Sequence, residues 1–300
     1  MSRNHRRVRL WILIIGLFLI GTLAGCAGRK ETNGVVAILT DLGAQDYYVG
    51  AIQGTVLATY PQAQVMVTTA EIPAFDVHKA AVTLLFTAQE FPPGTVFLAI
   101  VDPGGGSEQR AIAMKTANGQ FFVAPDNGLL TLVEQELEAT AIHAITNPAW
   151  TQPPRRDFVF PWRDLYPPAA AYLATGKPIA DAGPAVDDLV RLSIQPTHQE
   201  GSRVTGTVLT IDRFGNIQTN IPGEMMDTLG LSIGDPVRVT VGKRTLEAHF
   251  VHIYGDVPKG DPLVFVGAPG FVEVAINWGN AAEALGTQVE MLLTVEGPLP

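Results

Sequence analysis

The sequence places a strand-like run directly before an acid and a glycine turn: Gly94-Thr95-Val96-Phe97-Leu98-Ala99-Ile100 leads into Val101-Asp102-Pro103-Gly104-Gly105-Gly106. A continuous apolar run of this length is typical of a strand buried in a parallel sheet. Asp102 then stands where the strand ends, and the glycines let backbone approach a ligand closely. A plain turn is the alternative, since Ala111-Ile112-Ala113-Met114 starts another strand. A nucleotide phosphate loop is not indicated, because no Gly-Lys-Ser/Thr follows.

Strand and helix patterns alternate on both sides of this stretch. The pattern predicts an α/β domain with a mostly parallel sheet over residues 34–190. Asp76 is expected to cap one of its helices. The predicted strands are 34–40, 64–68, 94–100, 111–114 and 120–124, and the predicted helices are 46–58, 77–90, 129–138 and one that starts near 167.

The spacing of apolar residues changes after a linker predicted over residues 191–202. Short apolar runs separated by glycine, proline and aspartate turns fill residues 203–300. This pattern is typical of an all-β domain, most simply a small barrel or sandwich. The predicted strands are 206–211, 236–241, 246–253, 263–266, 271–276 and 288–294.

Charge and composition exclude some classes of protein. The chain has 300 residues, 47% of them hydrophobic and 16% charged, which is typical of a globular protein. The formal net charge is −9, and because residues 1–25 hold four arginines and no acid, the rest of the chain carries 16 basic against 29 acidic residues, or −13. Nucleic acid is therefore not expected as a partner.

The N-terminus has the pattern of a targeting segment. Arginines precede an apolar run from Leu10 to Leu23, which is short for a membrane-spanning helix of about 20 residues. The run ends at Leu23-Ala24-Gly25-Cys26 and resembles the lipobox of bacterial lipoproteins. That resemblance implies a signal peptide over residues 1–25, a lipidated Cys26, a tether over 26–33, and an exported protein anchored to the cell membrane. An ordinary membrane anchor with an incidental cysteine is the alternative.

Acids stand at the predicted ends of several strands. Asp41, Asp102 and Asp126 follow strand-like runs, and the carboxyl ends of parallel strands meet at one edge of a sheet. We therefore expect these acids to lie near a ligand. A divalent metal is an alternative for clustered carboxylates. No histidine stands at ligand spacing from any of them, so we predict no metal.

The predicted β domain has one unusually polar stretch. Ile211 to Ile221 reads Ile-Asp-Arg-Phe-Gly-Asn-Ile-Gln-Thr-Asn-Ile. Its acid could bind an ammonium, its ring could stack on a conjugated group, and its amide could bind a carboxylate. A polar hairpin is the alternative.

Eight motifs along the chain together resemble the S-adenosylmethionine hydroxide adenosyltransferase (SAM hydrolase) family, relatives of the adenosyl fluorinases and chlorinases. The resemblance runs from about Val35 to Ala282. Its motifs are Thr40-Asp41-Leu42-Gly43, Glu71-Ile72-Pro73-Ala74-Phe75-Asp76-Val77, Pro92-Pro93-Gly94-Thr95-Val96, Val101 to Gly106, Pro125-Asp126-Asn127-Gly128-Leu129-Leu130, Arg163-Asp164, Asp212 to Asn216 with Thr219-Asn220-Ile221, and Gly279-Asn280-Ala281-Ala282.

The resemblance implies a fold, an assembly and a reaction. It implies an α/β domain, a β-barrel, and a homotrimer whose sites lie between one subunit's first domain and its neighbour's barrel. The implied reaction is attack of water or hydroxide on the ribose C5′ of S-adenosylmethionine, which gives adenosine and methionine. The sulfonium is already a good leaving group, so the protein must chiefly align the nucleophile and partly strip its water. No cofactor is implied.

In the first domain, the resemblance assigns binding roles to four residues besides Asp102. Asp41 would bind the ribose hydroxyls, with Asp46 and Tyr48 close by, and Phe75 would pack near the ribose and sulfonium. Asp102 matches the acid that lies beside the nucleophile.

In the second domain, the resemblance assigns the two ends of the substrate. Asp212 would bind the methionine ammonium, Phe214 would pack on the adenine, and Asn216 would bond the methionine or the adenine end. Backbone of Asn280 and Ala281 would meet the adenine edge, and Tyr254 would close that pocket.

The chain departs from the family at two of the three residues that hold the attacking water. The hydrolases resemble one another in an Asp–Arg–His set, and here Gln109 stands at the arginine position and Pro161 at the histidine position. Arg110, one place later, could serve as the catalytic arginine if the loop shifts. Hydrolysis is the predicted function. An S-adenosylmethionine- or adenosine-binding lipoprotein with impaired turnover is the main alternative, and a halide adenosyltransferase is a lesser one.

Overall fold

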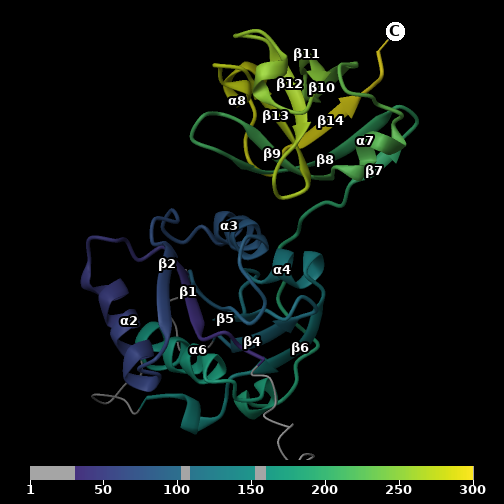
Figure 1. Cartoon of the computed structure of the whole chain (residues 1–300). Helices are drawn as coiled ribbons and strands as arrows, with labels where there is room; N and C mark the ends of the chain where they lie inside the picture. The colour runs from purple at the N-terminus through teal and green to yellow at the C-terminus, as the bar shows by residue number, and fades with distance from the viewer. Residues whose placement is uncertain (1–30, 103–108, 153–159, 300) are drawn as a thin grey trace, which may run out of the picture. The chain divides into compact units, whose positions relative to one another are not determined.

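The computed structural model describes residues 31–102, 109–152 and 160–299, which form an α/β domain followed by a β-barrel (Figure 1). Both parts of the predicted fold class are therefore confirmed. The predicted signal peptide, the lipobox cysteine and the glycines at 104–106 lie outside the described residues.

The first domain is built on one six-stranded sheet. Its strand order is β2-β1-β3-β5-β4-β6, in which β2, β1, β3 and β5 pair in parallel and β4 pairs antiparallel with β5 and β6. The sheet is therefore mostly parallel, as predicted. Its strands are β1 Val35–Thr40, β2 Gln64–Thr69, β3 Val96–Ile100, β4 Ala111–Thr116, β5 Phe121–Pro125 and β6 Ala139–Ala144.

Helices cover both faces of this sheet, because alternate strand residues point to opposite sides. In β3, Val96 and Leu98 pack with residues of α2 (Tyr47–Thr59) and α6 (Tyr166–Ala174). Phe97 and Ala99 pack with residues of α3 (Val77–Gln89) and α4 (Thr131–Glu136) on the other face. The domain is thus a three-layer sandwich. A residue that follows a strand lies on one face of the sheet or the other according to whether its position in the chain is odd or even.

The second domain is a closed barrel. An eight-stranded sheet runs in the order β14-β10-β11-β12-β13-β9-β8-β7, and pairing of β14 with β8 closes seven of these strands into a ring. The short β7 pairs with the first part of β8 and lies outside the ring. The strands are β7 His198–Glu200, β8 Arg203–Ile211, β9 Ile217–Pro222, β10 Pro236–Val241, β11 Arg244–Phe250, β12 Pro262–Val266, β13 Phe271–Ile276 and β14 Leu292–Glu296.

Most predicted elements are present, but the strands β6, β7 and β9 were not predicted and other elements differ in extent. The helix predicted over 129–138 is the shorter α4, because β6 begins at Ala139. The strand β9 follows the polar stretch at Asp212, and β7 lies inside the residues predicted as a linker. The strands predicted at 246–253 and 288–294 are shifted, to β11 and β14. The predicted cap is confirmed, since the Asp76 carboxylate accepts from the Lys79 main-chain nitrogen at 2.8 Å.

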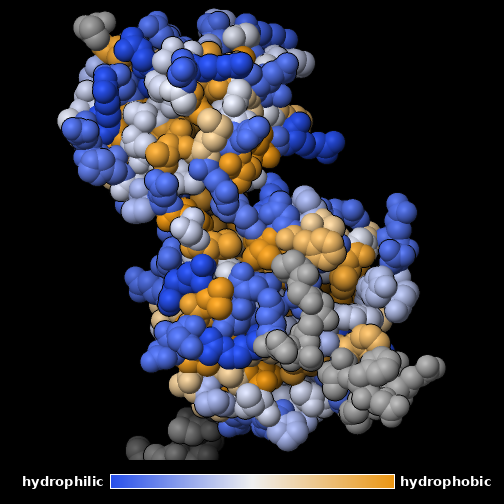
Figure 2. Space-filling model, turned by 180° about the vertical axis from the view of Figure 1, so that it is seen from behind, coloured by the Kyte–Doolittle hydropathy of each residue, from blue (hydrophilic) through white to orange (hydrophobic). Residues whose placement is uncertain are grey.

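On the face opposite to that of Figure 1, the surface is mainly hydrophilic, with hydrophobic residues in separate patches (Figure 2). Five aromatic side chains with substantial exposure belong to the predicted binding residues or stand within two positions of one: Tyr47, Phe75, Phe214, Tyr254 and Trp278. In the described part of the chain, no helix has the length and apolar content needed to cross a membrane.

Candidate active site

A cavity of about 310 Å³ opens at the carboxyl ends of β1 and β3. These strands pair in parallel, so the acids that follow them, Asp41 and Asp102, reach the same edge of the sheet. The structure thereby brings together three of the predicted residues. The cavity is lined by Asp41, Leu42, Ala74, Phe75, Ile100, Asp102, Pro161, Trp162 and Tyr166.

Asp41 fixes the backbone of Phe75. The Asp41 Oδ2 atom accepts a hydrogen bond of 2.8 Å from the main-chain nitrogen of Phe75. Phe75 has a φ of +67°, a conformation that L-residues rarely adopt, and its ring is 63% exposed. The acid therefore holds an exposed aromatic ring at the mouth of the cavity, and no hydrogen bond is recorded for its Oδ1 atom among the described residues.

Aromatic side chains form the wall beside Asp102. Tyr166 is buried and Trp162 is half-buried, and both line the cavity. The ring of Tyr48 lies 5.1 Å from that of Trp162 in an edge-on arrangement, so Tyr48 supports the wall from behind. Neighbouring Tyr47 raises the pKa of Tyr48, with burial as a second cause. Asp46 is exposed at the start of α2 and does not line the cavity.

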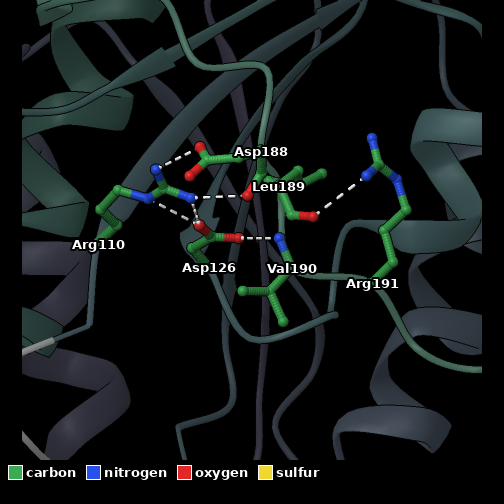
Figure 3. Close-up of polar contacts among 6 residues, drawn as sticks. All are labelled: Arg110, Asp126, Asp188, Leu189, Val190 and Arg191. Atoms are coloured by element: carbon green, nitrogen blue, oxygen red, sulfur yellow. Dashed lines mark hydrogen bonds and ion pairs between the residues drawn. The ribbon is translucent and has the colours of Figure 1, made fainter.

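Arg110 does not line the cavity. Figure 3 shows its guanidinium between two carboxylates: Nε donates to Asp126 Oδ2 at 2.8 Å, and NH1 donates to Asp188 Oδ1 at 2.6 Å. The Asp126 Oδ1 atom accepts from the Val190 main-chain nitrogen at 2.8 Å. These hydrogen bonds raise the pKa of Arg110, Asp188 first and Asp126 second. Asp126, expected near the ligand, instead joins the start of β4 to the segment around Val190.

The two positions at which the chain departs from the family differ in their surroundings. Pro161 begins the short helix α5 (Pro161–Asp164) and lines the cavity. Gln109 does not line it, and among the described residues its buried Oε1 atom has no hydrogen-bond partner. Behind Pro161, Arg163 forms two hydrogen bonds of 2.6 and 2.7 Å with the fully buried carboxylate of Asp164. This pair fixes α5 next to the cavity.

A second cavity, of about 670 Å³, lies on the barrel. It gathers four of the predicted binding residues with one more exposed ring, that of Trp278. Its lining residues are Asp212, Phe214, Asn216, Tyr254, Ile276, Asn277, Trp278 and Gly279.

A tight turn shapes one side of the second cavity. Asp212 Oδ1 accepts from the main-chain nitrogens of Phe214 and Asn216 at 2.8 and 2.9 Å, and Oδ2 accepts from Asn216 Nδ2 at 2.7 Å. Because β8 and β9 pair antiparallel, this turn is the polar hairpin considered as an alternative. The hairpin leaves the Phe214 ring 69% exposed. The backbone is thus a hairpin whose side chains are arranged around a cavity.

Asn280 and Ala281 support this turn and do not line the cavity. The Asn280 side chain caps the short helix α8 (Ala281–Leu285) by accepting from the Glu283 main-chain nitrogen at 2.9 Å. Ala281 is fully buried. Gly215 has a φ of +86°, and a Cβ atom there would collide with the Asn280 side chain.

Two residues of this region were not predicted. Trp278 is 82% exposed, has a φ of +61°, and carries the Lys259 ammonium 4.0 Å from its ring centroid. Glu273 is 8% exposed, and burial raises its pKa, with the nearby carboxylate of Asp212 acting in the same direction. Trp278 could have been found from the Gly279-Asn280 motif that directly follows it. Glu273 stands in an ordinary strand pattern, so the sequence gives no signal for it.

Across the residues that the structure describes, no three His, Cys, Asp or Glu side chains are grouped as a metal site would require. Carboxylates at the two cavities instead receive hydrogen bonds from backbone and amide nitrogens. They can therefore orient polar groups of an organic ligand.

Comparison with known proteins matches both domains. Residues 36–183 match the SAM hydroxide adenosyltransferase N-terminal domain, and residues 206–294 match the corresponding C-terminal domain. The chain is 39% identical over 253 residues to an (R)-S-adenosyl-L-methionine hydrolase of Salinispora arenicola, which covers 83% of this chain and 93% of that protein.

Two further relatives extend the comparison. A fluorinase of an Actinoplanes species is 26% identical over 295 residues, covering 88% of this chain and 97% of that protein. The crystal structure of an uncharacterized conserved protein from Thermotoga maritima superposes with a TM-score of 0.82 at 36% identity, over 87% of this chain and all of that one. The chain belongs to the SAM hydroxide adenosyltransferase family.

Proposed function

We propose that the protein is an enzyme that hydrolyses S-adenosyl-L-methionine to adenosine and L-methionine. The observation that carries this proposal is the convergence of Asp41, Phe75 and Asp102 on one cavity, in a chain that is 39% identical to a named (R)-S-adenosyl-L-methionine hydrolase. That relative's name specifies the R form at sulfur, so we extend the proposal to the R epimer.

In the proposed reaction, a water oxygen attacks the ribose C5′ as the C5′–sulfur bond breaks. The bonding electron pair goes to the sulfur, which leaves as the neutral thioether of methionine. The water loses a proton, which Asp102 accepts or passes to solvent. Alignment of water, C5′ and sulfur is the main contribution asked of the protein, because the sulfonium needs no acid to leave.

The proposed binding roles follow the two cavities. In the first, Asp41 Oδ1 accepts hydrogen bonds from the ribose hydroxyls, and the Phe75 ring packs beside the sugar. In the second, the exposed rings of Phe214 and Trp278 pack on the adenine, since aromatic side chains stack on nucleobases with about 1–3 kcal/mol each. Asp212 is proposed for the methionine ammonium.

Other predicted residues are proposed to act indirectly. Tyr48 supports Trp162, Asn216 holds the Asp212 carboxylate, and Asn280 holds the turn at Gly215. Arg110 is proposed as a positioning residue, because its guanidinium already binds Asp126 and Asp188. Its place directly before β4 lets it fix the chain that returns from Asp102.

The direct test is a product assay on the protein that lacks residues 1–26. The protein is incubated with separate R and S epimers of S-adenosylmethionine, and adenosine and methionine are followed by chromatography. We expect equal amounts of both products, faster release from the R epimer, and a loss of at least about 10²-fold in Asp102→Asn. Chloride and fluoride in parallel incubations test for halide transfer.

A binding protein without turnover is the second candidate, and the presence of Gln109 and Pro161 at the water-holding positions favours it. The same experiment separates the two functions when calorimetry is added. Saturable binding of S-adenosylmethionine with no product from either epimer would overturn the hydrolase and establish the binding protein.

We also propose that the active form is a homotrimer, with each site made from the first cavity of one subunit and the second cavity of its neighbour. The supporting observation is that the predicted residues divide between two domains. Asp102→Asn and Asp212→Ala subunits, each inactive alone, should regain part of the activity when mixed, unfolded and refolded together. A mixture as inactive as its components would contradict a shared site.

Lipid attachment at Cys26 is proposed from the sequence pattern. The full chain expressed in bacteria should take up labelled fatty acid and sediment with membranes. Cys26→Ser should lose the label and should not be processed before residue 26. Equal labelling of both proteins would argue against the lipobox.

A further inference from the structure

Tyr166 lines the first cavity together with Asp102, and it belongs to none of the eight motifs. It is the first residue of α6, and its side chain is only 2% exposed. A buried tyrosine that borders a cavity combines a packed ring with a polar tip available to a ligand.

The fold explains why these two residues meet. Leu98 and Ile100 of β3 pack on the sheet face covered by α2 and α6, whereas Val101 packs on the opposite face. Continued alternation carries Asp102 to the α6 side. The helix α6 packs against β3 and begins at Tyr166, so its first residue reaches the carboxyl end of that strand.

Within residues 31–102, 109–152 and 160–299, the Tyr166 hydroxyl has no recorded hydrogen-bond partner. It is not one of the fully buried side-chain atoms that lack a partner, and its residue lines the cavity. Burial raises the pKa of Tyr166 above its usual value, and the negative charge of Asp102 raises it further. The phenol therefore keeps its proton at neutral pH and can both donate and accept a hydrogen bond.

We propose that the Tyr166 hydroxyl and the Asp102 carboxylate together hold the attacking water in the first cavity. This inference rests on the proposed hydrolase function. In the family, an arginine and a histidine help to hold the attacking water, and Gln109 and Pro161 stand at their positions in this chain. Arg110 does not replace the arginine, because its guanidinium binds Asp126 and Asp188. The proposal gives part of this role to Tyr166.

Two hydrogen-bond acceptors are enough to orient a water molecule. One hydrogen of the water is donated to the Asp102 carboxylate and the other to the phenol oxygen, which leaves an oxygen lone pair directed at C5′. As the carbon–oxygen bond forms, the C5′–sulfur bond breaks with its electron pair moving to sulfur. The proton of the water passes to Asp102 and then to solvent, and the phenol keeps its own.

A purely structural role for Tyr166 makes the opposite predictions. The ring belongs to the core cluster that includes Trp150 and Leu173, so packing alone could account for its burial. In that case the hydroxyl contributes nothing to turnover. Tyr166→Phe, which removes only the hydroxyl, separates the two roles because the ring remains in place.

The experiment compares Tyr166→Phe with Tyr172→Phe. Tyr172 lies on the same helix, packs 5.9 Å from Trp150, and does not line the cavity, so it controls for loss of a hydroxyl from α6. Each variant is assayed for kcat, KM, adenosine affinity by calorimetry, and Tm. The wild type and Asp102→Asn are assayed in the same series.

We expect Tyr166→Phe to lower kcat by about 10- to 100-fold, the effect of one lost hydrogen bond to a reacting group. KM and adenosine affinity should stay within about twofold, and Tm should change little, because the hydroxyl has no hydrogen bond to lose among the residues that the structure describes. Tyr172→Phe should keep the wild-type kcat.

Three outcomes overturn the inference. Equal kcat in Tyr166→Phe and wild type shows that the hydroxyl does not hold the water, while hydrolysis itself stands. A lower Tm together with weaker adenosine binding and unchanged kcat shows a structural role. If the wild type releases no adenosine from either epimer, the proposed function fails first and the role of Tyr166 fails with it.

Discussion

The carboxylate of Asp41 accepts a 2.8 Å hydrogen bond from the main-chain nitrogen of Phe75 and so stabilises a backbone conformation that phenylalanine disfavours. The φ of +67° costs about 1 kcal/mol or more for a residue with a Cβ atom. Strain of this kind persists where the surrounding structure fixes it, and here it presents an aromatic ring at the first cavity.

Substitutions at Phe75 should separate backbone strain from ligand binding. Phe75→Gly relieves the strain and Phe75→Ala retains it, so we expect the glycine variant to be more stable by about 1 kcal/mol in urea unfolding. Both variants lack the ring, so calorimetry should show a similar loss of adenosine affinity. Equal stability of the two variants would contradict the strain.

Gly215 should tolerate alanine poorly. The added Cβ meets the Asn280 side chain at a φ of +86°, so the variant suffers both backbone strain and a disturbed cap of α8. We expect a loss of about 2–3 kcal/mol. Gly230→Ala is the matched control, since its φ is +73° but nothing lies within 4 Å. It should lose only about 1 kcal/mol. Similar losses would contradict a role for Asn280.

Arg110→Ala should lower Tm markedly, because it leaves the buried Asp126 carboxylate without its cation. Asp188→Ala removes the exposed partner of the same arginine and should change Tm little. The two variants distinguish a buried from an exposed ion pair around one guanidinium. Scanning calorimetry measures both, and a larger effect for Asp188→Ala would refute this assignment of the network in Figure 3.

Glu273 should make the protein less stable as pH rises. Burial raises its pKa in the folded protein, so the folded state binds a proton more tightly than the unfolded chain does. The stability linked to Glu273 is therefore full below the ordinary value near 4.5 and is lost as pH rises through the folded value. In Glu273→Gln, the free energy of unfolding should fall less between about pH 4 and pH 8. Equal slopes in both proteins would exclude Glu273 as a source of the pH dependence.

Local patterns of the sequence predicted the fold well. The cap at Asp76 depends on a residue three positions away, and β3 is a continuous apolar run, so both could be recognised directly. Three strands were not predicted, β6, β7 and β9, and the reasons for β6 and β9 are opposite. In β6, most residues are partly exposed and the apolar run is weak, while β9 alternates cleanly but follows a polar stretch that drew attention to binding.

The candidate site was predictable only in part. Asp41 and Asp102 could be placed together because parallel strands end at a common edge. The two carboxylate partners of Arg110 are 16 and 78 residues away, so no local pattern could show that its guanidinium is already engaged. Tyr166 was missed because it reads as one more apolar residue at the start of a helix, and only packing against β3 brings it to Asp102.

The alternation along β3 also constrains how this chain can evolve. Successive residues of β3 belong to opposite layers, and Asp102 follows two residues after the last of them, Ile100. Deletion or insertion of a single residue there would send Asp102 to the layer of α3 and α4, away from Tyr166. We expect descendants of this gene to show many exchanges of Val, Leu and Ile in β3 and no change in its length.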